Sequence, residues 1–99
     1  MKAAVFHGAD EGVRVEEIPV PQVGPDQVLV KVAACGACHT DLHYIEHGVP
    51  TFKAPPIVLG HEASGIVEEV GVDVDHLSVG QRVLIPAVLT CGKCKFCRM

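Results

Sequence analysis

Cysteine, histidine and acidic residues gather in three short stretches of the sequence. They are CGACHTDLH at residues 35–43, GHE at residues 60–62 and CGKCKFC at residues 91–97. Thiolate, imidazole and carboxylate groups are the usual protein ligands of zinc, and histidine also transfers protons near neutral pH. The three stretches are therefore the candidate chemical sites of the chain.

The first stretch combines a possible metal ligand with groups that can transfer a proton. If a helix begins near Cys38, the positive end of its dipole favours the thiolate that a metal requires. Thr40 and His43 then lie three positions apart on one helical face, where a hydroxyl and an imidazole can pass a proton. Asp41 is spaced to orient a histidine ligand from elsewhere in the chain.

Other interpretations of this stretch stay open. Cys35 and Cys38 form C-x-x-C, which also occurs in thiol redox proteins, although the βαβ context typical of those proteins is missing here. His39 is also compatible with a solvated surface position. His47 has no partner pattern in the sequence and is expected at the surface, as are His7 and His76.

The other two stretches also favour metal binding. His61 and Glu62 follow a glycine and precede a Val-rich segment; a lone histidine there is usually structural, but CHTDLH about twenty residues earlier favours a shared metal site. A closed structural zinc site normally has four protein ligands. The third stretch supplies three evenly spaced thiols, Cys91, Cys94 and Cys97.

Short Val-rich segments must position these groups. Gly and Pro separate the segments, and several alternate apolar with polar residues, which predicts a mainly β fold of the small barrel or sandwich kind. The predicted strands are residues 2–6, 13–17, 27–34, 63–71 and 81–89. One short helix is predicted near residues 38–47, with Gly48 and Pro50 as its stop signal.

Composition limits the class of protein. The 99 residues are 48% hydrophobic, which predicts one domain over residues 1–99 with a core of its own. The net charge of −4 and the lack of a basic stripe argue against nucleic acid as a partner. No apolar run approaches the ~20 residues of a membrane span, and no signal peptide is recognisable, so a cytoplasmic location is expected. Five cysteines without a secretion signal favour metal ligation over disulfides.

Four segments, read in order, resemble one enzyme family. GACHTDLH, GHEASGIVEEVG, GQRVLIP and CGKCKFC have the order and spacing of the zinc-dependent medium-chain alcohol dehydrogenases. The resemblance runs from MKAAVF to the last cysteine, and it implies the N-terminal GroES-like catalytic domain, a distorted β-barrel. It further implies oxidation of a small alcohol to an aldehyde or ketone with hydride transfer to NAD or NADP, in an enzyme that is a homo-oligomer.

The resemblance also implies roles around a catalytic zinc ion. Cys38 and His61 match two zinc ligands, and Glu62 matches an acid beside the metal that can itself become a ligand. Thr40 matches the hydroxyl that hydrogen-bonds the substrate alcohol. His43 matches the outer member of a proton relay.

Further positions match supporting roles. Asp41 matches the carboxylate behind the zinc-bound histidine, and His39 matches a position that approaches the cofactor pyrophosphate. Cys35 matches no ligand and is expected to be a small buried residue. Three of the four structural zinc ligands are matched by Cys91, Cys94 and Cys97.

Some parts of the family pattern have no counterpart in these residues. No G-x-G-x-x-G follows a strand, so the Rossmann domain is absent, and each of the two zinc sites lacks one ligand. The chain is therefore expected to be a fragment truncated within the structural zinc lobe and inactive alone. The alternative is a non-enzymatic zinc-binding module built on residues 91–97. A zinc ribbon, however, needs a second C-x-x-C pair, and Cys35 and Cys38 lie too far from Cys91 in the sequence to supply it.

Overall fold

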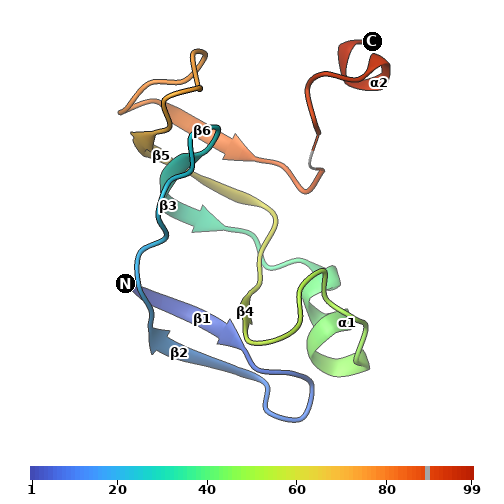
Figure 1. Ribbon diagram of the computed structural model, residues 1–99. Coiled ribbons are helices and arrows are strands. Elements are labelled where there is room, and N and C mark those ends of the chain that lie inside the picture. The colour runs from blue at the N-terminus through green and yellow to red at the C-terminus, as the bar shows by residue number, and fades with distance from the viewer. Residues whose placement is uncertain (89) are drawn as a thin grey trace.

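The computed structural model covers residues 1–99 and describes all of them except Leu89 (Figure 1). Six strands and two short helices follow one another along the described residues, which confirms the predicted mainly β fold. They are β1 (Lys2–Phe6), β2 (Val13–Glu17), β3 (Val28–Cys35), α1 (His39–His47), β4 (Ile57–Val58), β5 (Ala63–Val70), β6 (Arg82–Ile85) and α2 (Lys95–Arg98).

The strands lie in two antiparallel sheets, with the order β2-β1-β4 in one and β3-β5-β6 in the other. In the first sheet, Phe6 of β1 pairs with Val13 on one side and with Ile57 on the other. In the second, β5 is the central strand, and its first residue, Ala63, pairs with Cys35 of β3 and with Ile85 of β6. This register places the end of β3 next to the start of β5. The candidate chemical stretches at residues 35–43 and 60–62 therefore lie side by side.

The structure corrects the sequence prediction at three elements. The strand expected over residues 81–89 ends at Ile85, before a proline that has no N–H for a sheet; Leu89, its last expected residue, lies outside the described residues. Strand β4 was missed because its two residues form too short a pattern to recognise. The helix predicted near residues 38–47 is present as α1, but α2 was missed; it adds a single turn among the C-terminal cysteines.

Helix α1 begins and ends at residues that favour those boundaries. Cys38 is the extended residue before its first turn, and its backbone N–H donates to Asp41 Oδ2 at 3.1 Å. At the other end, Gly48 has the left-handed conformation, with φ of 63°, which side chains disfavour. None of the nine helical residues is buried, so the caps rather than a buried face define where this helix begins and ends.

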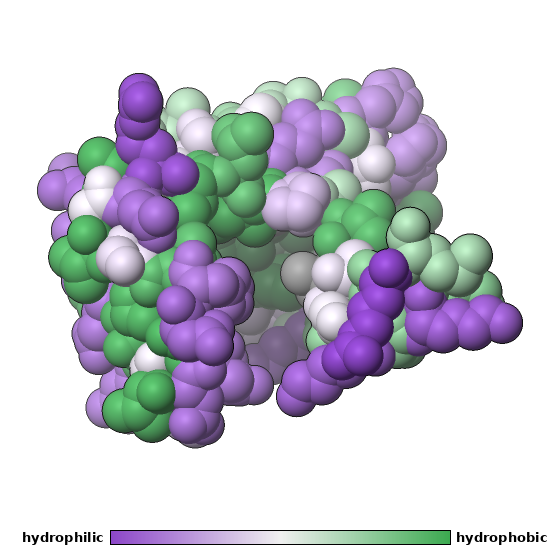
Figure 2. Space-filling view, turned by 90° about the horizontal axis from the view of Figure 1, so that it is seen from above, coloured by the Kyte–Doolittle hydropathy of each residue, from purple (hydrophilic) through white to green (hydrophobic). Residues whose placement is uncertain are grey.

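The apolar core is small. Only Val5, Phe6 and Val67 are buried hydrophobic side chains in the described part of the chain, whereas Leu84 is 83% exposed. Figure 2 shows a face that is hollowed, with hydrophobic residues exposed around the hollow. Across β5 and β6, Ile66 and Leu84 line a shallow groove of about 420 Å³. Neither helix in the described residues has the length and hydrophobicity that a bilayer crossing requires.

Candidate metal centres

Cys38, His61 and Glu62 come together where β3, α1 and β5 meet. Their ligand atoms all lie within 4.8 Å of one another. Cys38 precedes the first residue of α1, and the two other residues immediately precede β5. A backbone bond from Gly36 N–H to the Glu62 carbonyl, at 3.0 Å, continues the β3–β5 pairing toward this point. The sheet register and the helix cap therefore produce the cluster that the sequence spacing suggested.

Asp41 lies behind His61 on the side away from Glu62. The Asp41 Oδ1 atom is 3.6 Å from His61 Nδ1, whereas Glu62 Oε1 is 4.0 Å from His61 Nε2. Within the described residues, Asp41 Oδ1 is buried and has no hydrogen-bond partner. A small closure of the 3.6 Å gap would let an Nδ1–H group donate to this oxygen. The Nε2 lone pair would then point toward the thiol and carboxylate, as metal binding requires.

The donor set fits a zinc ion. A thiol, an imidazole and a carboxylate are all zinc ligands, and a catalytic zinc site uses three protein ligands of these kinds and leaves one position open. The unpartnered Asp41 oxygen fits as well, because a histidine ligand normally donates its second ring N–H to such a group. The geometry of the described residues is therefore compatible with zinc at Cys38, His61 and Glu62.

The other predicted active-site residues lie along α1. Thr40 Oγ1 is 3.6 Å from Cys38 Sγ, so the hydroxyl adjoins the candidate metal ligand. His43 lies one turn further along the helix and is exposed, as is His39. The imidazole rings of His39 and His43 contact each other edge to face, with their centroids 4.9 Å apart. A hydroxyl beside the thiol and an exposed imidazole one turn away are arranged in the order that proton release to solvent needs.

Gly36 is a site residue that sequence reasoning missed. A Cβ atom at this position would come within 2.5 Å of Glu62 Oε2, so only glycine leaves this carboxylate its present position. The only signal in the sequence was a glycine between two residues of the first cysteine-rich stretch.

The expectation that Cys35 is buried was wrong, because its side chain is exposed. Strand β3 is exposed from Lys31 to its end, since the described part of the chain packs no layer against that stretch. Among the hydrogen-bonding groups that the structure describes, the Cys35 thiol contacts only the carbonyl of Gly36, at 3.7 Å.

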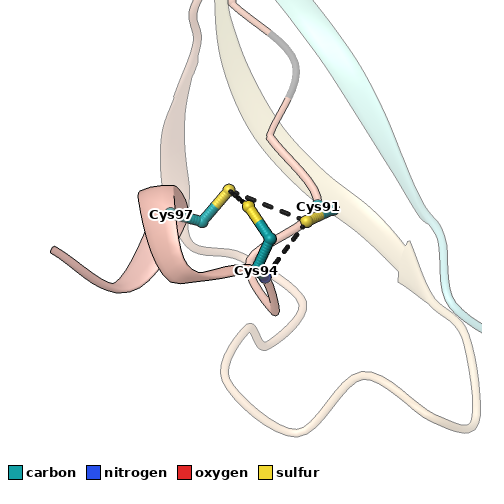
Figure 3. A group of neighbouring side chains, drawn as sticks. All are labelled: Cys91, Cys94 and Cys97. Carbon is teal, nitrogen blue, oxygen red and sulfur yellow. Dashed lines mark hydrogen bonds between the residues drawn. The ribbon is translucent and has the colours of Figure 1, made fainter.

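The C-terminal thiols form a second cluster (Figure 3). Cys97 Sγ, on α2, is 3.7 Å from Cys91 Sγ and 3.5 Å from Cys94 Sγ, and all three thiols are free. Two thiolates bound tetrahedrally to one zinc ion, at about 2.3 Å each, have sulfur atoms roughly 3.8 Å apart. The observed separations therefore fit ligands of one zinc ion.

Hydrogen bonding makes one of these thiols more acidic. The backbone N–H groups of Lys93 and Cys94 lower the pKa of the Cys91 thiol to about 7, and the neighbouring thiols act in the same direction. The Cys94 N–H lies 3.3 Å from Cys91 Sγ. Because zinc binds the thiolate form, these N–H groups prepare Cys91 for coordination near neutral pH.

Comparison with known proteins identifies the family of this chain. Residues 24–99, more than half of the chain, match the family model described as "Alcohol dehydrogenase GroES-like domain". The chain belongs to this alcohol dehydrogenase family. The expected GroES-like fold and the resemblance to medium-chain dehydrogenases are thereby confirmed.

Individual members of the family resemble the chain closely. An alcohol dehydrogenase from Geobacillus stearothermophilus is 44% identical over 98 residues, which are 98% of this chain and 29% of that protein. A sorbitol dehydrogenase from Bacillus subtilis is 43% identical over 100 residues, which are 99% of this chain and 28% of that protein.

A solved structure resembles the fold as well. A protein assigned as a zinc-binding dehydrogenase from Sinorhizobium meliloti 1021, bound to NADP, is 38% identical and superposes with a TM-score of 0.81. The match covers 98% of this chain and 28% of that chain. The chain thus spans less than a third of the length of the relatives it matches.

Proposed function

We propose that this chain is the catalytic-domain part of a zinc-dependent enzyme that oxidises an alcohol to an aldehyde or ketone, with hydride transfer to NAD or NADP. The observation that carries the proposal is the meeting of Cys38, His61 and Glu62 within 4.8 Å beside the Thr40 hydroxyl. Family membership and relatives named alcohol and sorbitol dehydrogenases support it.

Cys38 and His61 would hold the catalytic zinc ion, with Glu62 as a neighbouring or alternative ligand. Zinc in such a site acts as a Lewis acid that polarises the substrate oxygen. Asp41 Oδ1 lies 3.6 Å from His61 Nδ1 and would hold the ring once this gap closes, and the same carboxylate accepts from the backbone N–H of Cys38. One side chain would therefore position both zinc ligands.

Thr40 and His43 would remove the alcohol proton. The Thr40 hydroxyl adjoins the thiol, so it can accept a hydrogen bond from an alcohol placed against the metal site. His43 is exposed one turn along the same helix and can release the proton to solvent. Hydride transfer itself belongs to the nicotinamide cofactor, and His39, at the first position of α1, would approach its pyrophosphate.

The second cluster would have a structural role. Three thiolates from Cys91, Cys94 and Cys97 leave no position for a substrate once a fourth ligand completes the set. The Rossmann domain that holds NAD(P) has no sequence fingerprint in residues 1–99. We therefore expect hydride transfer only from a protein in which these residues are joined to such a domain.

Zinc analysis combined with enzyme kinetics tests the proposal. The longest naturally encoded protein that contains residues 1–99 would be assayed for NAD- and NADP-dependent oxidation of primary, secondary and polyhydric alcohols. We expect His61→Ala to lower kcat/KM by at least about 100-fold, because a Lewis acid contributes several kcal/mol and about 1.4 kcal/mol is a factor of ten.

His76→Gln is the matched control, because His76 is an exposed histidine outside the cluster and adjoins only Asp75 among charged groups. Activity that survives in His61→Ala, or in protein stripped of zinc, would exclude zinc-dependent oxidation at this site.

A further inference from the structure

Three histidines lie on one face of helix α1. His39, His43 and His47 are four positions apart, which places their side chains one above another along the helix. The ring centroids are 4.9 Å apart for His39 and His43, and 5.4 Å apart for His43 and His47. His47 is exposed, as the sequence suggested, but its ring lies against that of His43, so it does have a partner.

This spacing is close to that of two imidazoles bound to one metal ion. Metal–nitrogen distances of about 2.0–2.1 Å and ligand angles of roughly 90–110° place two ring centroids about 5 Å apart. Both observed separations are near this value without any change in the helix backbone. The ends of the row, His39 and His47, are about 12 Å apart along the axis at a rise of 1.5 Å per residue, too far for one ion. A pair of ligands for one ion must therefore consist of His43 together with either His39 or His47.

We propose that α1 carries a surface site for a divalent transition-metal ion, with His43 as the shared ligand and either His39 or His47 as the second. This site is separate from the two cysteine-containing clusters. It consists of imidazoles alone. Imidazoles suit nickel, copper and zinc ions, whereas thiolates favour softer ions such as Cu(I). All three histidines are exposed, so an ion reaches them from solvent and water completes its coordination.

The site has a consequence for catalysis, and this consequence rests on the proposed function. An ion bound at His43 occupies a ring nitrogen that proton transfer would use. Binding at this helix would therefore inhibit the proposed enzyme, although neither catalytic zinc ligand would be displaced.

Calorimetric titration with Ni²⁺ tests the binding site. The full chain would first be loaded with two equivalents of zinc, which the thiolate-containing clusters bind in preference to exposed imidazoles, and would then be titrated in parallel with His39→Gln, His43→Gln, His47→Gln and the control His76→Gln. Gln is a good helix former and cannot chelate in this way, and the four positions are exposed, so folding is expected to persist.

We expect His43→Gln to weaken nickel binding by about 100-fold, because joining two ligand groups raises affinity by that order or more. His39→Gln and His47→Gln each leave one pair and should retain most of the affinity, and His76→Gln should match the parent. Equal nickel affinity in the parent and His43→Gln would overturn the proposal, as would tight binding that is lost in His76→Gln.

An activity assay separates this proposal from the proposed function. Nickel that binds through His43 and inhibits would support both. Nickel that binds through His43 without inhibiting would support the metal site and contradict the proton-transfer role of His43. A protein that oxidises alcohols but does not bind nickel at α1 would overturn the metal site alone.

Discussion

Asp41 joins two functions in one carboxylate. Its Oδ2 atom accepts the backbone N–H of Cys38 at the start of α1, and its Oδ1 atom faces His61 Nδ1 without a hydrogen-bond partner among the described residues. The same side chain thus caps the helix and lies where it can orient the imidazole when a metal binds.

Asp41→Asn should therefore weaken zinc binding and largely preserve the helix, because an amide oxygen can still accept the capping N–H. We expect affinity at the His61 site to fall 10- to 100-fold, the usual effect of altering a group that orients a metal ligand. NMR of the His61 ring during zinc titration against a chelator measures it. Asp75→Asn is the matched control, since Asp75 is an exposed carboxylate beside His76; equal losses in both variants would contradict the orienting role.

The alkylation rate of Cys91 should depend on pH differently from that of an ordinary thiol. Backbone N–H groups stabilise its thiolate, so its pKa is lowered to about 7 in the folded chain. The thiolate is the reactive form and becomes dominant as pH rises above the pKa. In zinc-free protein, alkylation at Cys91 should therefore reach half of its maximal rate near pH 7.

Mass spectrometry after brief iodoacetamide treatment resolves this cysteine from the others. In denaturant, where the N–H groups no longer converge on the sulfur, the midpoint should move up toward the ordinary thiol value of about 8.5. Identical midpoints in folded and denatured chains would show that the N–H groups of Lys93 and Cys94, the latter drawn in Figure 3, do not act on Cys91.

Among the elements, the pairing of β3 with β5 matters most for the site. Gly65 is buried in β5, and a Cβ atom there would collide with the backbone carbonyl oxygen of Lys31. A backbone atom cannot move aside as a side chain can, so Gly65→Ala should destabilise the fold by about 2–3 kcal/mol. This corresponds to a melting temperature lower by about 10–15 °C for a domain of this size.

Thermal unfolding followed by circular dichroism measures the loss. Glu68→Ala is the control, since Glu68 lies on the same strand, is exposed, and makes only a weak ion pair with Lys31 at 4.0 Å. Its melting temperature should stay close to that of the parent. A Gly65→Ala protein as stable as Glu68→Ala would mean that the two strands can separate at this point without cost.

The sequence predicted the elements whose patterns are local. Five strands and helix α1 were recognisable from Val-rich segments and from Gly48 as a stop. The two-residue strand β4 was not, because it exists only through pairing with Phe6 and Val5 of β1. The contact of Gly36 with Glu62 and the exposure of Cys35 were also missed, because both depend on how distant segments pack.

The candidate site was predictable for a different reason. Cys38 and Asp41 lie within one helical turn, so their spacing alone brought them together. A metal role for His61 was suggested by CHTDLH about twenty residues earlier, but its pairing with Cys38 as zinc ligands came from the family resemblance, since no periodicity relates residues on separate elements. The neighbouring rings of His43 and His47 were open to sequence reasoning, because a spacing of four on a predicted helix is enough to place them together.

Over the whole molecule, apolar surface exceeds what the small core buries. Ile66 and Leu84 are 43% and 83% exposed, and they line the groove across β5 and β6. Residues 1–99 alone should therefore bind a hydrophobic fluorescent dye. Leu84→Ser should lower the dye signal and scarcely affect stability, because this side chain is already in solvent.

Val72→Ser provides the comparison for dye binding. Val72 is 90% exposed but lies in the turn after β5, outside the groove. A loss of fluorescence in Val72→Ser as large as that in Leu84→Ser would mean that the dye does not report on the groove.

The two metal clusters differ in the length of chain that each must gather. Cys91 and Cys97 are only six positions apart, so a nascent or unfolded chain can bring these thiols together at little cost in loop closure. Cys38 and His61 meet only after β3 and β5 have paired in register. The cysteine cluster can therefore capture its ion before the protein has folded, whereas occupancy of the other site reports that the sheet is already assembled.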